Sequence, residues 1–155
     1  MNDIVKNFAT LAKEEGFNAT PIPGIGIYKA EMSSGRGPLC YSQGIIFVVQ
    51  GQKQVYFDQQ VYQYCPENYL VLTLPLPAEC ETIVEPGKPL LAMTLDFDMG
   101  LLNELVRLFD DHGKISNKDK LHETKSLFVS QCTQSLLDAL FKLSECLQSP
   151  LQCDA

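Results

Sequence analysis

The sequence predicts a mostly β protein, an antiparallel sandwich or barrel that is followed by helices. Between Ile25 and Leu95, short β-rich runs alternate with turn residues at a spacing of roughly ten residues, which is typical of that fold class. On either side of this block the apolar residues follow the helical period instead. With 155 residues, 45% of them hydrophobic and 20% charged, the chain has the size and balance of a single globular domain.

The chain is expected to begin with a helix from Asn2 to Glu15, with Gly16 as its C-terminal stop. The apolar residues of this stretch fall on one helical face, and they are Ile4, Phe8, Leu11 and Ala12. Residues 17–24 contain two prolines and a glycine, which predict a loop. Residues 33–38, Ser-Ser-Gly-Arg-Gly-Pro, are predicted to form a polar turn.

The β block is expected to contain six or seven short strands. The predicted strands are 25–28, 41–50, 54–57, 61–64, 69–74, 82–84 and 90–95. The unbroken apolar run from Ile45 to Val49 indicates a strand that is buried on both faces, or one at the centre of a sandwich. Asp58 and Gln59 are predicted to form a two-residue hairpin turn, and residues 66–68 another turn.

Two helices are predicted after the β block. Asp98 can cap the first, whose apolar face runs from Leu101 to Phe109, and the charged stretch 110–125 is expected to be a loop. A last strand is predicted at 127–129. Thr133 is a suitable cap for the second helix, which is expected to run to Gln148 and to end before Pro150.

The net charge of −7 argues against nucleic-acid binding by this chain alone, because such binding depends largely on cations that replace counterions on phosphates. Its only arginines are Arg36 and Arg107. The chain does not begin with a basic segment followed by an apolar stretch, and no apolar run approaches the roughly 20 residues of a membrane span. We therefore expect a cytoplasmic protein whose six cysteines are reduced thiols, mostly in the core, with an oxidant- or aldehyde-sensing thiol as the alternative.

No motif in the sequence identifies a catalytic site. His112 and His122 lie outside the strand block, so the barrel interior offers no imidazole to a metal ion. No G-x-S-x-G and no C-x-x-C occurs. Asp96 and Asp98 would share a face on a strand and could act as paired carboxylates, but a strand end followed by a helix cap is the simpler interpretation. We expect no metal, no cofactor and no catalytic residue, and hence a protein that is not an enzyme.

All six tyrosines of the chain lie between residues 28 and 69. Tyrosine combines an apolar body with a polar tip, which suits a pocket for a small organic ligand. Cross-strand aromatic pairs that only build the sheet are the alternative. We predict a ligand-binding cavity in the barrel, and its candidate lining residues are Tyr28, Tyr41, Phe47, Tyr56 and Tyr69.

Five short motifs follow one another through the chain. They are Thr20-Pro21-Ile22-Pro23-Gly24, the V-x-Q-G-x-K-x-V pattern within 46–57, the segment 64–71 that ends in Tyr-Leu-Val, the pair Leu76-Pro77, and the segment 89–98. In this order and spacing they resemble the N-terminal sensor domain of AraC-type transcriptional regulators, over residues 20–150. Asp58 and Glu67 stand where that family commonly has a turn glycine.

The resemblance implies a cupin-like double-stranded antiparallel β-barrel that binds a small effector, with no metal in it, and that is followed by C-terminal helices. It also implies a helix-turn-helix DNA-binding domain, which we expect to be missing from this chain. The expected organisation is an N-terminal helix at 1–16, a barrel sensor domain at 17–98, and a helical dimerisation and linker segment at 99–155. DNA would then be a partner only through the missing domain.

The broad apolar side of the last helix predicts a homodimer. Its candidate interface residues are Leu136, Leu137, Leu140, Phe141 and Leu147. Two other classes of protein stay open. One is a stand-alone barrel enzyme, such as an isomerase or an oxygenase, and the other is a dimerisation module whose barrel is packed solid and binds no ligand.

Overall fold

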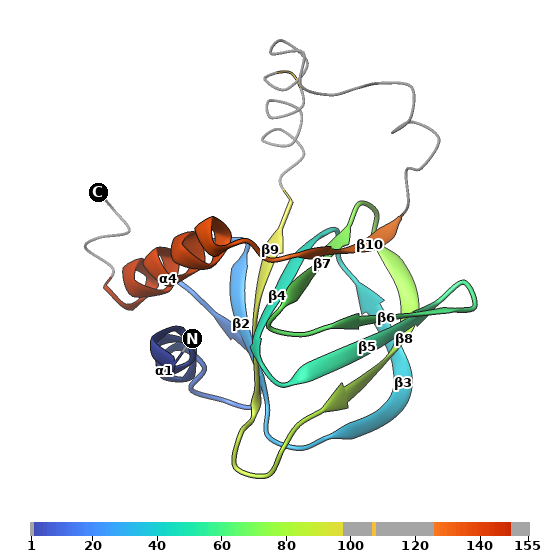
Figure 1. The fold of residues 1–155 in the computed structure, drawn as a ribbon, viewed down its shortest axis with the longest axis horizontal. Coiled ribbons are helices and arrows are strands. Elements are labelled where there is room, and N and C mark those ends of the chain that lie inside the picture. Colours follow the sequence, from blue (N-terminus) through green and yellow to red (C-terminus); the bar gives the residue numbers. More distant parts are fainter. Residues whose placement is uncertain (1, 98–106, 108–125, 150–155) are drawn as a thin grey trace.

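The computed structural model describes residues 2–97, 107 and 126–149, and in these it has two facing β-sheets and two helices (Figure 1). The helices are α1 (Asn2–Leu11) and α4 (Gln134–Gln148). The strands are β1 (Gly16–Ala19), β2 (Ile25–Ala30), β3 (Ser34–Tyr41), β4 (Gly44–Gln50), β5 (Gln52–Phe57), β6 (Gln60–Tyr64), β7 (Asn68–Leu72), β8 (Leu76–Ile83), β9 (Leu90–Asp96) and β10 (Leu127–Gln131). The predicted mostly β fold with a C-terminal helix is confirmed.

All strand pairs are antiparallel within the described residues. One sheet has the order β1-β2-β9-β4-β7-β10, and the other has the order β3-β8-β5-β6. Their hydrogen-bonded ladders stay separate in the described part of the chain, so the two sheets face each other without closing into a ring. Strand β10 joins the first sheet beside β7, with Leu127 opposite Leu72.

The bend between β4 and β5 carries the chain from one sheet to the other at Gly51. This residue has φ +84°, a conformation that favours glycine. A Cβ there would lie 3.1 Å from the Cα of Leu90, so the bend needs glycine for space as well. Gly51 belongs to the V-x-Q-G-x-K-x-V motif, and it sets the direction of the following strand.

The prediction for the N-terminal region was wrong in two places. Helix α1 ends at Leu11 and not at Glu15, because the Asn18 side chain binds the backbone that would have continued the helix. Its Oδ1 accepts from the Glu14 amide at 3.0 Å, and its Nδ2 donates to the Glu14 carbonyl at 2.9 Å. Residues 16–19, expected as the helix stop and part of a loop, form β1 and pair with β2. The loop predicted from the prolines begins only after Ala19.

The predicted polar turn at 33–38 is also wrong, because Ser34 to Tyr41 form β3. This strand lies at the edge of its sheet and pairs only with β8, so its glycines and Pro38 are tolerated and most of its residues are exposed. The expected strand 41–50 is broken, since β3 ends at Tyr41 and β4 begins at Gly44. Strand β8 is longer than the predicted 82–84, and the block from Ile25 to Asp96 holds eight strands where six or seven were expected.

Two local predictions are confirmed. Asp58 and Gln59 both have positive φ, 52° and 62°, as a two-residue hairpin turn between β5 and β6 requires. Thr133 caps α4, with its Oγ1 accepting from the Leu136 amide at 3.1 Å. Both are set by residues next to each other in the chain.

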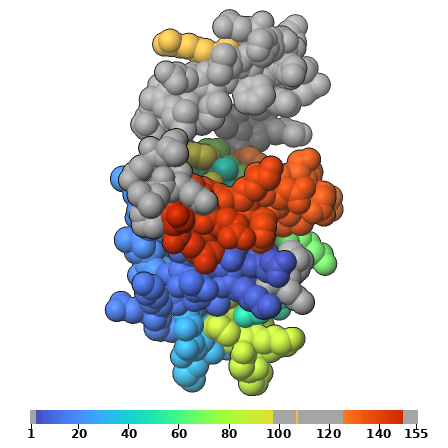
Figure 2. Space-filling view, turned by 90° about the vertical axis from the view of Figure 1, so that its left-hand side faces the viewer, coloured from blue at the N-terminus to red at the C-terminus, as the bar shows by residue number. Residues whose placement is uncertain are grey.

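The six-stranded sheet is buried on both faces. One face packs against the four-stranded sheet through a core that includes Val48, Leu70 and Leu90. The other face is covered by α1 and α4, which lie side by side on that side of the molecule (Figure 2). There Phe8 and Leu140 pack in one cluster with strand residues such as Met93. The two helices are joined by a hydrogen bond from Asn7 Nδ2 to the buried Ser144 Oγ, 3.0 Å long.

Neither of the two helices described is long and apolar enough to cross a membrane.

Candidate functional site: a cavity between the two sheets

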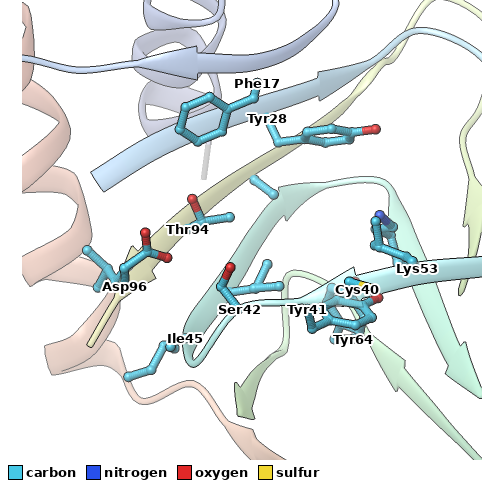
Figure 3. A pocket seen from close by; sticks show the side chains of 15 residues that line it. Phe17, Tyr28, Cys40, Tyr41, Ser42, Ile45, Lys53, Tyr64, Thr94 and Asp96 are labelled. Atoms are coloured by element: carbon cyan, nitrogen blue, oxygen red, sulfur yellow. Dashed lines mark hydrogen bonds between the residues drawn. The ribbon is translucent and has the colours of Figure 1, made fainter. Parts of the chain in front are cut away.

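A cavity of about 310 Å³ opens between the two sheets (Figure 3). Its walls come from β1, β2, β3, β4, β5, β6 and β9. The volume lies at the lower end of the roughly 300–1,000 Å³ of small-molecule sites in proteins. The apolar part of the wall is formed by Leu39, Ile45, Ile46, Ala92 and Leu95. The cavity can therefore hold a small organic molecule with an apolar body.

Two tyrosine hydroxyl groups meet at the inner end of the cavity. The Oη atoms of Tyr41 and Tyr64 lie 3.0 Å apart, and both side chains are buried. Burial raises the pKa of both phenols, and the neighbouring Tyr41 adds to the effect on Tyr64. Both hydroxyl groups are therefore neutral near pH 7 and can donate hydrogen bonds.

A lysine lies beside these tyrosines. Lys53 stands opposite Tyr64 in the β5–β6 register, and only 8% of its surface is exposed. Its Nζ is 5.1 Å from the centre of the Tyr28 ring. Burial lowers the pKa of the Lys53 ammonium. In the described part of the chain, this ammonium has no hydrogen bond and no salt bridge.

The other end of the cavity is more open and carries Ser42, Thr94 and Asp96. Asp96 is exposed at the end of β9, where its amide donates to the Gly24 carbonyl at 2.8 Å. Phe17 from the edge strand β1 lies over this region, although 64% of its surface is exposed. Its ring occupies the space where a Cβ of Gly26 would be, so the absence of a side chain at Gly26 lets the ring lie there.

The structure brings only two of the five predicted lining residues to this cavity, Tyr28 and Tyr41. Phe47 and Tyr69 pack on the helix-covered face of the sheet, with their ring centres 5.3 Å apart. Tyr56 points to the outer side of the four-stranded sheet, where its hydroxyl donates to Glu81 Oε1 at 2.7 Å. Which residues contact a ligand stays a prediction.

Tyr64 and Lys53 line the cavity and were not among the predicted residues. A signal for Lys53 exists in the sequence, because strand residues two apart share a face. Lys53 lies two residues before Val55, which is fully buried. Lysine is rarely buried, so the lysine of the V-x-Q-G-x-K-x-V motif is expected at the surface unless the inward face of the strand is known.

The predicted dimer residues lie on or near the side of α4 that faces the rest of the domain. Leu140 and Leu147 are buried among α1 and the sheet, and Leu136 and Phe141 pack against the same cluster. Leu137 is half-buried beside a shallow groove that Asp3 and Ile4 of α1 also line. Dimerisation through these residues stays a prediction.

The described residues include no group of three or more His, Cys, Asp and Glu side chains that could hold a metal ion. The five cysteines among them, Cys40, Cys65, Cys80, Cys132 and Cys146, are free thiols. Burial raises the pKa of Cys132, which makes its thiol less reactive. His112, His122, Asp98 and Cys153 lie outside the described residues.

Comparison with known protein families matches residues 21–155 to the family described as the N-terminus of AraC-type transcriptional regulators. The chain therefore belongs to this family of N-terminal domains. Comparison with curated proteins finds no match.

Solved structures of ToxT from Vibrio cholerae share the fold. The apo K231A variant from strain SCE256 has 10% sequence identity and a TM-score of 0.55, over 90% of this chain and 54% of that one. Wild-type ToxT of that strain with an unsaturated fatty acid bound has 11% identity and a TM-score of 0.51, over 84% and 47%. ToxT from strain O395 bound to (E)-4-(8-methylnaphthalen-1-yl)but-3-enoic acid has 9% identity and a TM-score of 0.53, over 81% and 49%. This chain thus spans about half the length of the structures it matches.

Proposed function

We propose that this chain is the effector-sensing part of an AraC-type transcriptional regulator, and that the effector binds in the cavity between the two sheets. The observation that carries the proposal is the cavity itself, whose apolar walls end in polar groups from Tyr41, Tyr64 and Lys53. A domain needed only for packing would gain by filling this space, because interiors are close-packed. The bound molecules named for ToxT, an unsaturated fatty acid and an arylbutenoic acid, support a small ligand with an apolar body.

The same strands form the cavity wall and the surface on which the helices pack. On β4, Ile46 lines the cavity and the next residue, Phe47, packs toward the helices. On β9, Ala92 likewise lines the cavity, and the next residue, Met93, packs toward the helices. A ligand that shifts these strands would therefore change the packing under α1 and α4, and would favour one of two helix arrangements by its difference in affinity.

The rest of the proposed mechanism concerns parts outside the cavity. We place a helix-turn-helix domain after this chain, so that α4 and the following residues transmit the effector signal to DNA in the cytoplasm. Homodimers would form through the surface where α1 and α4 meet, with Leu137 at the groove beside Asp3 and Ile4. Light scattering at tens of micromolar should give a dimeric mass, and Leu137→Glu should reduce it to that of a monomer.

A cavity-filling variant tests the main proposal. Small organic molecules are first screened by thermal shift on the 155-residue chain. Thr94→Phe, which adds a ring to the cavity wall, should abolish the shift caused by any hit, because the ring takes the ligand's place. Val61→Phe is the matched control, since Val61 is exposed on β6 and lines no part of this cavity. In the full regulator, Thr94→Phe should also remove the transcriptional response to that hit.

Two results would contradict the proposal. One is a hit that binds Thr94→Phe as well as it binds the wild-type chain. The other is a chain that binds none of the molecules, together with a regulator whose response is unchanged when this domain is deleted.

A further inference from the structure

We propose that the effector carries a carboxylate and that Lys53 is the residue that binds it. This inference rests on the proposed function, since it concerns the ligand of the same cavity. It assigns the chemical class of the effector's polar group and the residue that recognises it.

Lys53 occupies an inward position on a strand whose other inward residues, Val55 and Phe57, are apolar. Strand β5 alternates, with Lys53 and Val55 buried and Gln52 and Gln54 more exposed. The register places Lys53 between Tyr64 on β6 and Thr82 on β8, and both of these are buried. Because burying a lone charge is costly, a lysine here needs a compensating partner.

The described residues supply no carboxylate partner, and the nearby Cys80 thiol only partly offsets the effect of burial, which lowers the pKa of Lys53. The only carboxylate that lines the cavity is Asp96, which lies at the opposite end from Lys53 (Figure 3). The two carboxylates of β8 point to the outer face, where Glu81 accepts from Tyr56 and Glu79 pairs with Arg36. The Tyr28 ring, 5.1 Å away, offers a weak cation–π contact that still leaves the ammonium's donors free.

The surroundings of Lys53 favour an anion over a neutral ligand. A carboxylate would accept charge-assisted hydrogen bonds from the ammonium, which lines the cavity on a side chain that is only 8% exposed. The Tyr28 hydroxyl, which has no hydrogen bond in the described part of the chain, is a second donor for the same group. The apolar wall at Ile46 and Ala92 would then contact the ligand's hydrocarbon body.

The test compares three probes that share one apolar chain and differ in head group: octanoate, octanamide and 1-octanol. Each is titrated into the 155-residue chain at pH 7 by calorimetry, and amide chemical shifts of β4 and β9 report whether it enters the cavity. Octanoate should bind about tenfold or more tightly than the two neutral probes, as expected for a charge-assisted hydrogen bond.

Lys53→Met keeps the apolar stem and removes the charge. It should lower the affinity for octanoate to the affinity for octanamide. Lys88→Met is the matched control, because Lys88 is exposed and pairs with Glu85 at 3.7 Å outside this cavity. It should leave the preference for octanoate unchanged. If Lys53→Met does not fold, the pKa of Lys53 is measured in the wild-type chain instead, from the pH dependence of its ¹³Cε chemical shift with and without each probe. Octanoate should raise the pKa of Lys53 and octanamide should not.

The contrary outcomes separate the two proposals. Equal affinity for all three probes, with shifts in β4 and β9, would overturn the assignment to Lys53 and leave the cavity as a site for neutral ligands. A preference for octanoate that survives in Lys53→Met would also overturn it. No shift in the cavity with any probe would reject this inference, while the effector screen above judges the proposed function on its own.

Discussion

The two faces of the six-stranded sheet are both buried, yet they are built from different residues. The face under α1 and α4 is closed by apolar side chains such as Phe8, Leu91 and Met93, which are almost fully buried. The face toward the four-stranded sheet includes a lysine and two tyrosine hydroxyl groups around a cavity. Close packing of apolar groups maximises stability, whereas an internal space edged by polar groups is useful only if a ligand fills it. The comparison thus separates the face that holds the domain together from the face that we propose to be functional.

Phe8→Ala should have the largest effect on the helix-covered face. Phe8 is fully buried between α1 and the sheet, so the truncation leaves a cavity and should cost about 3–5 kcal/mol of unfolding free energy. Urea denaturation with an unchanged slope would measure it. A loss below about 1 kcal/mol would mean that α1 contributes little to the fold. It would contradict the claim that the helix-covered face holds the domain together.

Gly44→Ala tests the rim of the cavity. A Cβ at Gly44 would overlap the Leu95 carbonyl oxygen of the neighbouring strand, which cannot move without disturbing the sheet, so we expect a loss of up to about 3 kcal/mol. Gly26→Ala is the matched control, because its Cβ would meet only the exposed ring of Phe17, which can turn away. In thermal denaturation, the melting temperature of Gly44→Ala should therefore be well below that of Gly26→Ala. Similar melting temperatures would contradict the claim that the Leu95 carbonyl leaves no space for a side chain at Gly44.

Lys53→Met should act in the opposite direction on the cavity face, raising the unfolding free energy by about 1–2 kcal/mol at pH 7 because it removes an unpaired buried charge. The gain depends on pH. The Lys53 pKa is lowered in the folded chain, so between that value and the ordinary 10.5 the unfolded chain binds more protons and wild-type stability rises with pH. The advantage of Lys53→Met should therefore shrink from pH 7 toward pH 10.5 in urea denaturation at several pH values.

A second titration separates the lysine from the tyrosines. The pKa values of Tyr41 and Tyr64 are raised in the folded chain, so above about pH 10 both the wild-type chain and Lys53→Met should lose stability together. A constant difference between the two chains from pH 7 to pH 10 would show that the Lys53 charge is already compensated in the folded protein. That result would weaken the argument for an anionic ligand.

Thr133→Ala should have the smallest effect, a loss of about 1 kcal/mol, because it removes one cap hydrogen bond at the start of α4. Hydrogen exchange of the first-turn amides, Leu136 above all, would locate the effect. Ser135→Ala is the control, since Ser135 is exposed and has no side-chain hydrogen bond in the described part of the chain. Equal losses for the two variants would show that α4 is held by packing alone.

The sequence by itself determined the class of fold, the Asp58-Gln59 hairpin, the Thr133 cap and the family, because these depend on neighbouring residues and on motif order. It could not determine which aromatic residues face the cavity. The run from Ile45 to Val49 is apolar at every position, so nothing in it distinguishes the face of Ile46 from that of Phe47. The register of β5 with β6 and β8 then turned Lys53 inward and Tyr56 outward. Pairing between distant strands decided both outcomes, because a one-residue change of register moves every side chain to the other face.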